Sequence, residues 1–178
     1  KAAEAAEAAE ATEKFWEYHD ALFEKGGAFD DDTLIEIAEE LDLDVSSRVA
    51  LDIGSSTGGF TQVLLQRNVS EVSAVDVGTD QLHKSLRDDS RVYVYENCDI
   101  RKFESQKKFD LVVSDVAFIS LLPILNDVDR LATDDIILLF KPQFEVGREV
   151  KRDKNGVVLD KKAILNTMQK FEDACELK

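Results

Sequence analysis

Residues 51–60 read Leu51-Asp52-Ile53-Gly54-Ser55-Ser56-Thr57-Gly58-Gly59-Phe60, an apolar run that gives way to a glycine-rich segment. Glycine at such a point lets the backbone turn sharply and approach a ligand, and a helix that follows presents free N–H groups. Taken alone, a strand-to-helix turn that binds nothing would have the same residues. The segment predicts a strand, a turn and a helix in that order. Whether the turn binds a ligand has to be judged from residues elsewhere in the chain.

Short β-branched runs alternate with helical stretches through residues 48–178. The expected strands are Arg48–Ile53, Val72–Asp76, Val92–Tyr95, Asp110–Asp115 and Asp135–Phe140. The expected helices lie near Gly58–Arg67, Asp80–Arg87, Ser120–Ala132 and Lys161–Glu176. Strands and helices that alternate over short connections predict an α/β fold with a Rossmann-like, doubly wound parallel sheet.

An acidic residue ends the second expected strand, and its separation in sequence from the first strand is informative. Asp76 comes 24 residues after Asp52, about where a doubly wound fold hydrogen-bonds the hydroxyls of a ribose. The glycine segment reads GSSTGG, which is neither the dinucleotide fingerprint GxGxxG nor a P-loop, and it has no lysine to hold a triphosphate. These features favour a nucleoside ligand without a polyphosphate.

Further charged residues follow the later strands. Asp99 comes after the third strand and could accept a hydrogen bond from an adenine amino group, while Asp115 and Lys141 close the fourth and fifth strands. Each of them alone could be a helix cap or a surface residue. Open α/β sheets place their ligands at the carboxyl ends of the strands, so the set as a whole indicates a site.

The negative charge is concentrated at the N-terminus. The chain of 178 residues has a formal net charge of −15, of which −12 falls in residues 1–47 and −3 in residues 48–178. Residues 1–47 begin with an Ala/Glu tract and continue with the apolar pattern of a helical hairpin. We therefore expect two parts, an acidic helical segment at 1–47 packed on an α/β core at 48–178. The charge argues against free nucleic acid as an obvious partner.

Other classes are disfavoured by composition. No apolar run approaches the roughly 18–20 residues of a membrane span, and no signal core is present, which favours a cytoplasmic protein. The two cysteines, Cys98 and Cys175, lie far apart and form no metal-ligand cluster, so we expect reduced thiols and no metal.

Four segments together resemble the TlyA (hemolysin-A-like) family of S-adenosylmethionine-dependent RNA methyltransferases, which is related to FtsJ. They read LDIGSSTGGFTQVLL, AVDVGTDQL, SDVAFISL and LLFKPQFEVGRE, and the resemblance runs from about residue 49 to 178. It implies a Rossmann-like methyltransferase fold and 2′-O-methylation of ribosomal RNA. It also implies S-adenosylmethionine as the cofactor, held at its methionine end by Asp52, Gly54, Ser55, Ser56, Thr57, Gly58 and Gly59, at its ribose by Asp76 and at its adenine by Asp99.

The same resemblance implies a catalytic set of the order Lys-Asp-Lys-Glu. Asp115 and Lys141 match its second and third members. Residues 41–48, where the family has its first lysine, contain none, and the glutamate belongs to a segment beyond Lys178. We therefore expect a C-terminally truncated sheet and impaired catalysis. The family's alternative name suggests a membrane-active hemolysin, but the chain shows no basic amphipathic segment.

Residues 14–44 resemble another family, the helical insertion of DsbA-like thiol-disulfide oxidoreductases. The CxxC on which that exchange depends is absent, so no redox chemistry is expected here. Two unrelated resemblances and a charge break near residue 47 suggest an engineered or recombined chimera. A chimeric scaffold without catalytic function, which would bind RNA poorly, is accordingly the alternative to the methyltransferase.

Overall fold

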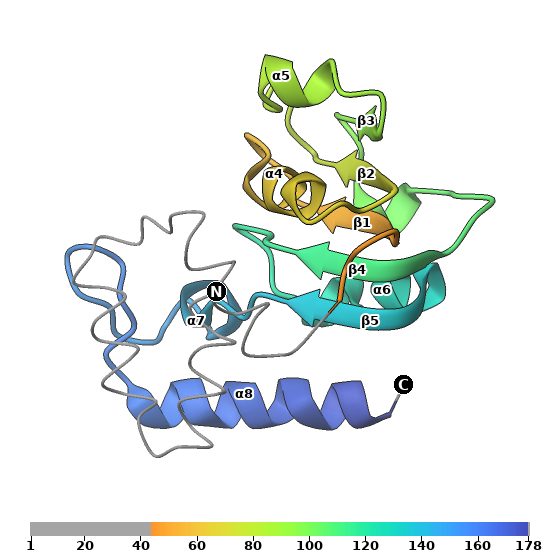
Figure 1. Cartoon of the computed structure of the whole chain (residues 1–178). Helices are drawn as coiled ribbons and strands as arrows, with labels where there is room; N and C mark the ends of the chain where they lie inside the picture. Colours follow the sequence, from red (N-terminus) through yellow and green to blue (C-terminus); the bar gives the residue numbers. More distant parts are fainter. Residues whose placement is uncertain (1–43, 178) are drawn as a thin grey trace. The chain divides into compact units, whose positions relative to one another are not determined.

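The computed structural model describes residues 44–177, which form parts of two compact units (Figure 1). The sheet unit contains the described residues 44–116 and 126–138, and the helical unit contains residues 117–125 and 139–177. The expected Ala/Glu tract lies outside the described residues, and so does the expected hairpin up to residue 43. Each unit is described by itself below.

A five-stranded parallel sheet forms the centre of the sheet unit. Its strands are β1 (Val49–Ile53), β2 (Glu71–Val75), β3 (Val92–Tyr95), β4 (Phe109–Ser114) and β5 (Ala132–Leu138), in the order β3-β2-β1-β4-β5. The register pairs Asp52 of β1 with Ala74 on one side and Val113 on the other. The expected doubly wound α/β fold is confirmed.

The direction of winding reverses beside β1. The chain passes from β1 through α4 (Gly59–Gln66) to β2, and through α5 (Lys84–Arg87) to β3, before it returns to β4 on the opposite side of β1. Right-handed crossovers then place α4 on one face and α6 (Leu125–Leu131) on the other, as Figure 1 shows. The carboxyl ends of β1 and β4 therefore meet at the switch point of the sheet, where such folds bind ligands.

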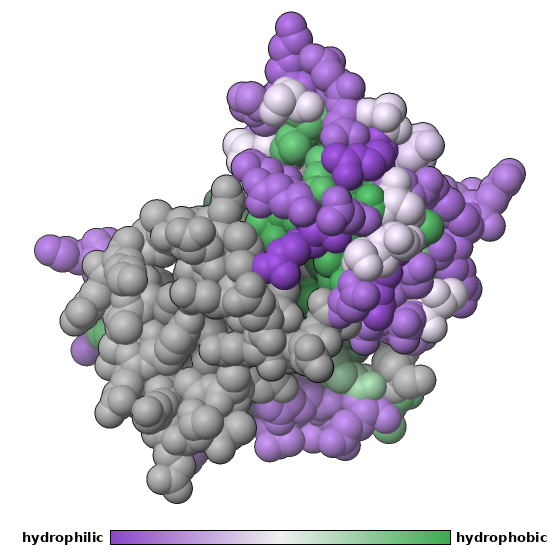
Figure 2. Space-filling model, in the orientation of Figure 1, coloured by the Kyte–Doolittle hydropathy of each residue, from purple (hydrophilic) through white to green (hydrophobic). Residues whose placement is uncertain are grey.

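Apolar residues of the sheet and α4 form the core of this unit. A parallel sheet covered on both faces needs nearly continuous apolar strands, and β1 and β2 each bury their last four residues. The main cluster consists of Val45, Ala50, Leu64, Leu65, Val69, Val72, Ala74, Leu82, Leu86, Val92, Leu111 and Val113. On the face shown in Figure 2, polar side chains predominate over this unit and apolar residues are visible in narrow stretches between them.

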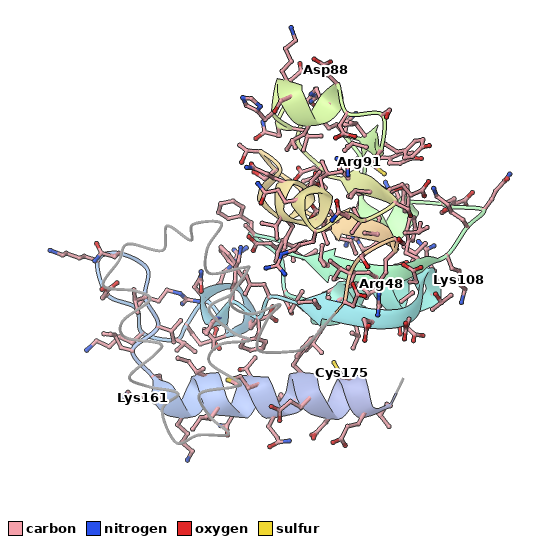
Figure 3. All side chains as sticks on the ribbon, viewed as in Figure 1. Arg48, Asp88, Arg91, Lys108, Lys161 and Cys175 are labelled. Atoms are coloured by element: carbon pink, nitrogen blue, oxygen red, sulfur yellow. The ribbon has the colours of Figure 1, made fainter. Side chains whose placement is uncertain are left out.

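Arg48, labelled in Figure 3, precedes β1 and forms hydrogen bonds to residues of two other strands. Its guanidinium donates to the Asp110 carbonyl at 3.0 Å and to the Asp135 carboxylate at 2.5 Å, and so links β1 to β4 and β5. The Val49 N–H donates to the Asp110 carboxylate at 2.7 Å. These bonds join β1, β4 and β5 away from their carboxyl ends, which remain available for a site.

Three expected elements differ from the structure by more than one residue at an end. The helix expected over Asp80–Arg87 is reduced to α5, because residues 80–82 direct their N–H groups at a side chain 14 to 16 residues downstream and Asp80 has a left-handed φ of 53°. The helix expected over Ser120–Ala132 begins as a 3₁₀ turn, η2 (Leu122–Ile124), with Pro123 in it, and α6 follows. Strand β5 starts at Ala132, three residues earlier than expected, because Ala132 already pairs with Phe109.

The helical unit contains η2, α7 (Pro142–Glu145) and α8 (Lys161–Glu176). Helix α8 has the expected bounds and is capped by Asp160, whose carboxylate accepts from the Ala163 N–H at 3.0 Å. The Phe140 and Phe171 rings pack with centroids 5.7 Å apart. Neither Cys98 nor Cys175, which is labelled on α8 in Figure 3, forms a disulfide bond. Within residues 44–177 no helix combines the length and apolar character that a membrane crossing requires.

Candidate functional site at the carboxyl ends of the strands

Gly54 brings the end of β1 against the backbone that follows β4. Its φ is +79°, and a Cβ at this position would lie 3.1 Å from the Asp115 carbonyl oxygen. The Gly54 N–H donates to the Val75 carbonyl at 2.8 Å, and the Asp115 N–H donates to the Ile53 carbonyl at 3.1 Å. The ends of β1, β2 and β4 are thereby tied together, and the acids that follow them lie close to one another.

The glycine loop, residues 54–59, adopts a turn that leaves part of its surface open. Ser55 is buried and its carbonyl accepts from the Gly58 N–H at 2.8 Å, whereas Ser56 and Thr57 are exposed. A Cβ on Gly59 would meet nothing within 4 Å. The first turn of α4 therefore has space beside it, as a ligand at a helix N-terminus requires.

Gly58 is the position at which a side chain is least tolerable. Its φ is +105°, and an added Cβ would lie 2.1 Å from Cδ1 of Leu86 and 2.8 Å from Cδ1 of Leu82, both buried. We expect Gly58→Ala to destabilise the fold by about 1–3 kcal/mol, measured by urea unfolding. Gly59→Ala is the matched control and should cost less than about 0.5 kcal/mol. Equal losses in the two variants would contradict this account of the loop.

Asp76 joins the glycine loop to the loop after β2. Its Oδ2 accepts from the Ser56 N–H at 2.8 Å, and its Oδ1 accepts from the Gly78 N–H at 2.6 Å. Each carboxylate oxygen has a second lone pair, so both can still accept from a pair of ligand hydroxyls. Asp76 thus has the place and the acceptor capacity expected of a ribose-binding acid.

Asp52 is buried beneath the glycine loop. It is fully inaccessible to solvent, and its Oδ2 accepts from the Thr61 hydroxyl of α4 at 2.6 Å. No hydrogen bond is made to its Oδ1 within the described residues. Burial raises the pKa of Asp52 to about 7, and the nearby carboxylates of Asp115 and Asp76 act in the same direction. The site therefore contains a carboxyl group that titrates near neutrality.

The raised pKa makes the stability of the fold depend on pH. Because the pKa is about 7 when folded, against an ordinary value of 3.8, the folded state binds more protons between these values. The contribution of Asp52 to the free energy of unfolding should then fall as pH rises from about 4 to 7. Asp52→Asn keeps the shape of the side chain but cannot carry the charge. The difference in free energy of unfolding between this variant and the wild type should therefore shift in favour of the variant by about 2–4 kcal/mol from pH 5 to pH 8. Urea unfolding at the two values measures this, and parallel pH profiles would contradict it.

Asp99 caps the 3₁₀ turn η1 (Ile100–Lys102) and pairs with Arg101. Its Oδ1 accepts from the Arg101 N–H at 3.0 Å, and its Oδ2 lies 2.5 Å from Nη2 of the same residue. This hydrogen-bonded arginine lowers the pKa of Asp99 to about 2. An adenine amino group would therefore share the carboxylate with Arg101.

Glu96, at the end of β3, was not among the residues expected from sequence. Its carboxylate accepts from the N–H groups of Asp80, Gln81 and Leu82 at 2.7, 2.8 and 3.1 Å, and it also contacts the Arg87 guanidinium. The bond from Arg87 is the main reason that the pKa of Glu96 falls to about 2. The sequence could have marked Glu96 as a candidate, because it directly follows the expected strand Val92–Tyr95 just as Asp76 follows β2.

The two residues of the expected catalytic set belong to different units. Asp115 follows β4 in the sheet unit, and the negative charge of its carboxylate helps to raise the pKa of Asp52. Lys141 belongs to the helical unit, where it stands at the N-cap of α7. In that unit the Glu145 carboxylate accepts from the Ser120 hydroxyl at 2.6 Å and from the Leu121 N–H at 2.9 Å. The loop after residue 116 is thus attached to α7.

The described residues contain no group of three or more acids, histidines or cysteines placed to hold a metal.

The sheet order, the glycine loop and the strand-end acids define the class as a Rossmann-like methyltransferase fold. Residues 33–178 match the FtsJ-like methyltransferase family, and the chain belongs to that family. The match includes residues 33–47, which we expected to belong to the acidic N-terminal segment.

Individual relatives within this family are similar to the chain over much of its length. The 23S rRNA (cytidine-2′-O)-methyltransferase TlyA of Campylobacter jejuni is 52% identical over 137 residues, which are 77% of this chain and 54% of the relative. The 16S/23S rRNA (cytidine-2′-O)-methyltransferase TlyA of Mycobacterium tuberculosis is 45% identical over 120 residues, 65% of this chain and 45% of the relative. This chain thus spans about half the length of these proteins.

A solved structure gives the same picture. The protein from Lactococcus lactis described as a "putative hemolysin" superposes with a TM-score of 0.72 at 38% identity, over 79% of this chain and 70% of that one. The resemblance to the TlyA family is therefore confirmed. None of these three matches supports the resemblance of residues 14–44 to thiol-disulfide oxidoreductases.

Proposed function

We propose that the chain is the cofactor-binding domain of an S-adenosylmethionine-dependent methyltransferase that modifies a ribose 2′-hydroxyl of ribosomal RNA. The observation that carries the proposal is Asp76, whose carboxylate joins the glycine loop to the loop after β2 at the end of the sheet where ligands bind. The rRNA methyltransferase names of the relatives support the reaction and the substrate class.

The residues present suit this cofactor. S-adenosylmethionine carries a sulfonium and an ammonium group, and the buried carboxyl of Asp52 with Asp76 and Asp115 nearby favours a cation. Its ribose diol needs two acceptors, which Asp76 offers. In the proposal, the glycine loop borders the methionine end and Asp99 faces the adenine.

When bound, the cofactor supplies an electrophilic methyl group that needs no further activation. The protein must then align the ribose hydroxyl and lower its affinity for its proton. In the family set a lysine stabilises the oxygen as negative charge develops on it, and an aspartate orients that lysine. Lys141 and Asp115 match these two positions of the set. These two roles are proposed from the family set.

One segment of the acidic chain has the opposite charge. Residues 141–162 contain seven lysines and arginines against four acids, and Arg148, Lys151 and Lys154 are exposed there. Such a segment is suited to phosphate contacts, which rest on cationic side chains. It supports RNA as the partner, and an rRNA substrate would place the protein in the cytoplasm.

We expect the chain alone to transfer methyl groups slowly, because residues 41–48 lack the lysine that begins the family's catalytic set. A chimeric scaffold without catalytic function stays the alternative prediction. The two differ in one result, since a scaffold would transfer nothing however well it binds the cofactor.

The test is methyl transfer to ribosomal RNA. The chain is incubated with radiolabelled S-adenosylmethionine and protein-free rRNA or intact subunits, and the RNA is hydrolysed with alkali. A 2′-O-methyl group blocks cleavage at its own nucleotide, so label in alkali-resistant dinucleotides is the expected result. Label only on free nucleotides would indicate a base methyltransferase and contradict the proposal, and no label at all would favour the scaffold.

A further inference from the structure

Glu96 collects more backbone donors than any side chain described above. Three successive N–H groups, those of residues 80–82, converge on its carboxylate, and the side chain is only 12% exposed. Consecutive N–H groups that point at one anion hold the backbone in a single conformation. Removing the carboxylate would take the acceptor from all three N–H groups at once, and the loop would lose the contacts that fix it.

The loop that Glu96 holds is the one that begins at Asp76. The Cys98 N–H donates to the Asp76 carbonyl at 2.9 Å, and the Asn97 N–H donates to the Gly78 carbonyl at 2.8 Å. Residues 76 and 78 are thus attached by the backbone after β3, and residues 80–82 by the Glu96 side chain. The end of β3 fixes the whole loop from Asp76 to Leu82.

The same loop supports the glycine loop from the side. Leu82 is buried and fills the space that a side chain on Gly58 would need. The His83 N–H donates to the Thr57 carbonyl at 3.1 Å. A shift of residues 80–82 would therefore be passed on both to Asp76 and to the backbone of the glycine loop.

We propose that Glu96 is a positioning residue for the cofactor, which holds the loop after β2 so that Asp76 and the glycine loop keep their binding arrangement. The inference rests on the proposed function, because it takes S-adenosylmethionine as the ligand. Glu96 acts through the loop and need not touch the ligand. Its low pKa keeps it ionised over the pH range of ordinary assays.

The first test is calorimetric titration of S-adenosylmethionine into Glu96→Gln, an isosteric change that turns an amide towards the N–H donors. We expect the affinity to fall about tenfold, which corresponds to the loss of one charge-assisted hydrogen bond. Glu96→Asp keeps the charge but shortens the reach, and it should also weaken binding. Wild-type affinity in both variants would overturn the inference.

Asp89 provides a matched control at the other end of β3. Its carboxylate accepts from the N–H, Nε and Nη2 of Arg91 at 2.9, 3.0 and 2.8 Å, and its pKa is also lowered to about 2 (Arg91 is labelled in Figure 3). Asp89→Asn should lower stability but change the affinity less than about twofold. If it weakens binding as much as Glu96→Gln, the effect is general loosening and the inference fails.

A double-mutant cycle separates positioning from a general structural role. If Glu96 acts in part through Asp76, Glu96→Gln should weaken the affinity of an Asp76→Asn protein less than it weakens that of the wild type, whereas independent effects would add in full. Hydrogen exchange of the free protein gives a second readout that needs no cofactor. The amides of residues 80–82 should lose protection in Glu96→Gln while those of β1 keep theirs. Unchanged protection would refute the role of Glu96, and an ordered loop in a wild-type chain that binds no cofactor would refute the proposed function instead.

Discussion

Replacing Asp76 by alanine is expected to weaken S-adenosylmethionine binding by about 10- to 100-fold. The substitution removes both acceptors for the ribose hydroxyls, and it also releases the Ser56 and Gly78 N–H groups that the carboxylate holds. One change thus affects the ligand contact and the two loops that frame it. Titration calorimetry of the variant measures the loss.

The control for this variant is Asp80→Asn on the same loop, which keeps a residue that tolerates the left-handed φ of 53° at this position. The Asp80 side chain is 92% exposed, while its N–H makes the bond to Glu96. Removal of the Asp80 charge should leave the affinity within about twofold of the wild type, as surface changes usually do. If Asp76→Ala binds as the wild type does, Asp76 has no part in the cofactor site.

Replacing Lys141 by alanine should slow methyl transfer strongly while cofactor binding is largely kept. Removal of one charged group that stabilises a developing oxyanion costs about 10²–10³-fold in rate. We therefore expect transfer to rRNA to fall by about that factor, with the dissociation constant of S-adenosylmethionine changed less than about threefold. Lys170→Ala, on the exposed surface of α8, is the control and should transfer normally. A Lys141→Ala protein that methylates at the wild-type rate would contradict the assigned role.

Much of the fold and the site was predictable because local residue types determine it. The alternation of apolar runs and helical periodicity predicted the parallel sheet, and strand β3 and helix α8 have the expected bounds. Gly54 and Gly58 were recognisable because their left-handed backbone admits few other residues. Asp52, Asp76 and Asp115 came together because successive strands of such a sheet end at one edge.

The remaining features depend on contacts between distant residues. Helix α5 is short because Glu96, far along the chain, takes the N–H groups that a longer helix would have used, and no local pattern shows this. The pairing of Asp99 with Arg101 and the pKa of Asp52 follow from side-chain placement and burial. Strand β5 began early because its register is set by Phe109 of β4.

Calorimetric titration of S-adenosylmethionine into the wild-type chain tests the central claim most directly. The site at the ends of β1 and β2 predicts saturable binding to one site per chain, reduced at least tenfold in Asp76→Ala. Absence of binding at millimolar cofactor by a chain whose sheet is intact by circular dichroism would contradict the claim that this is a cofactor-binding methyltransferase domain.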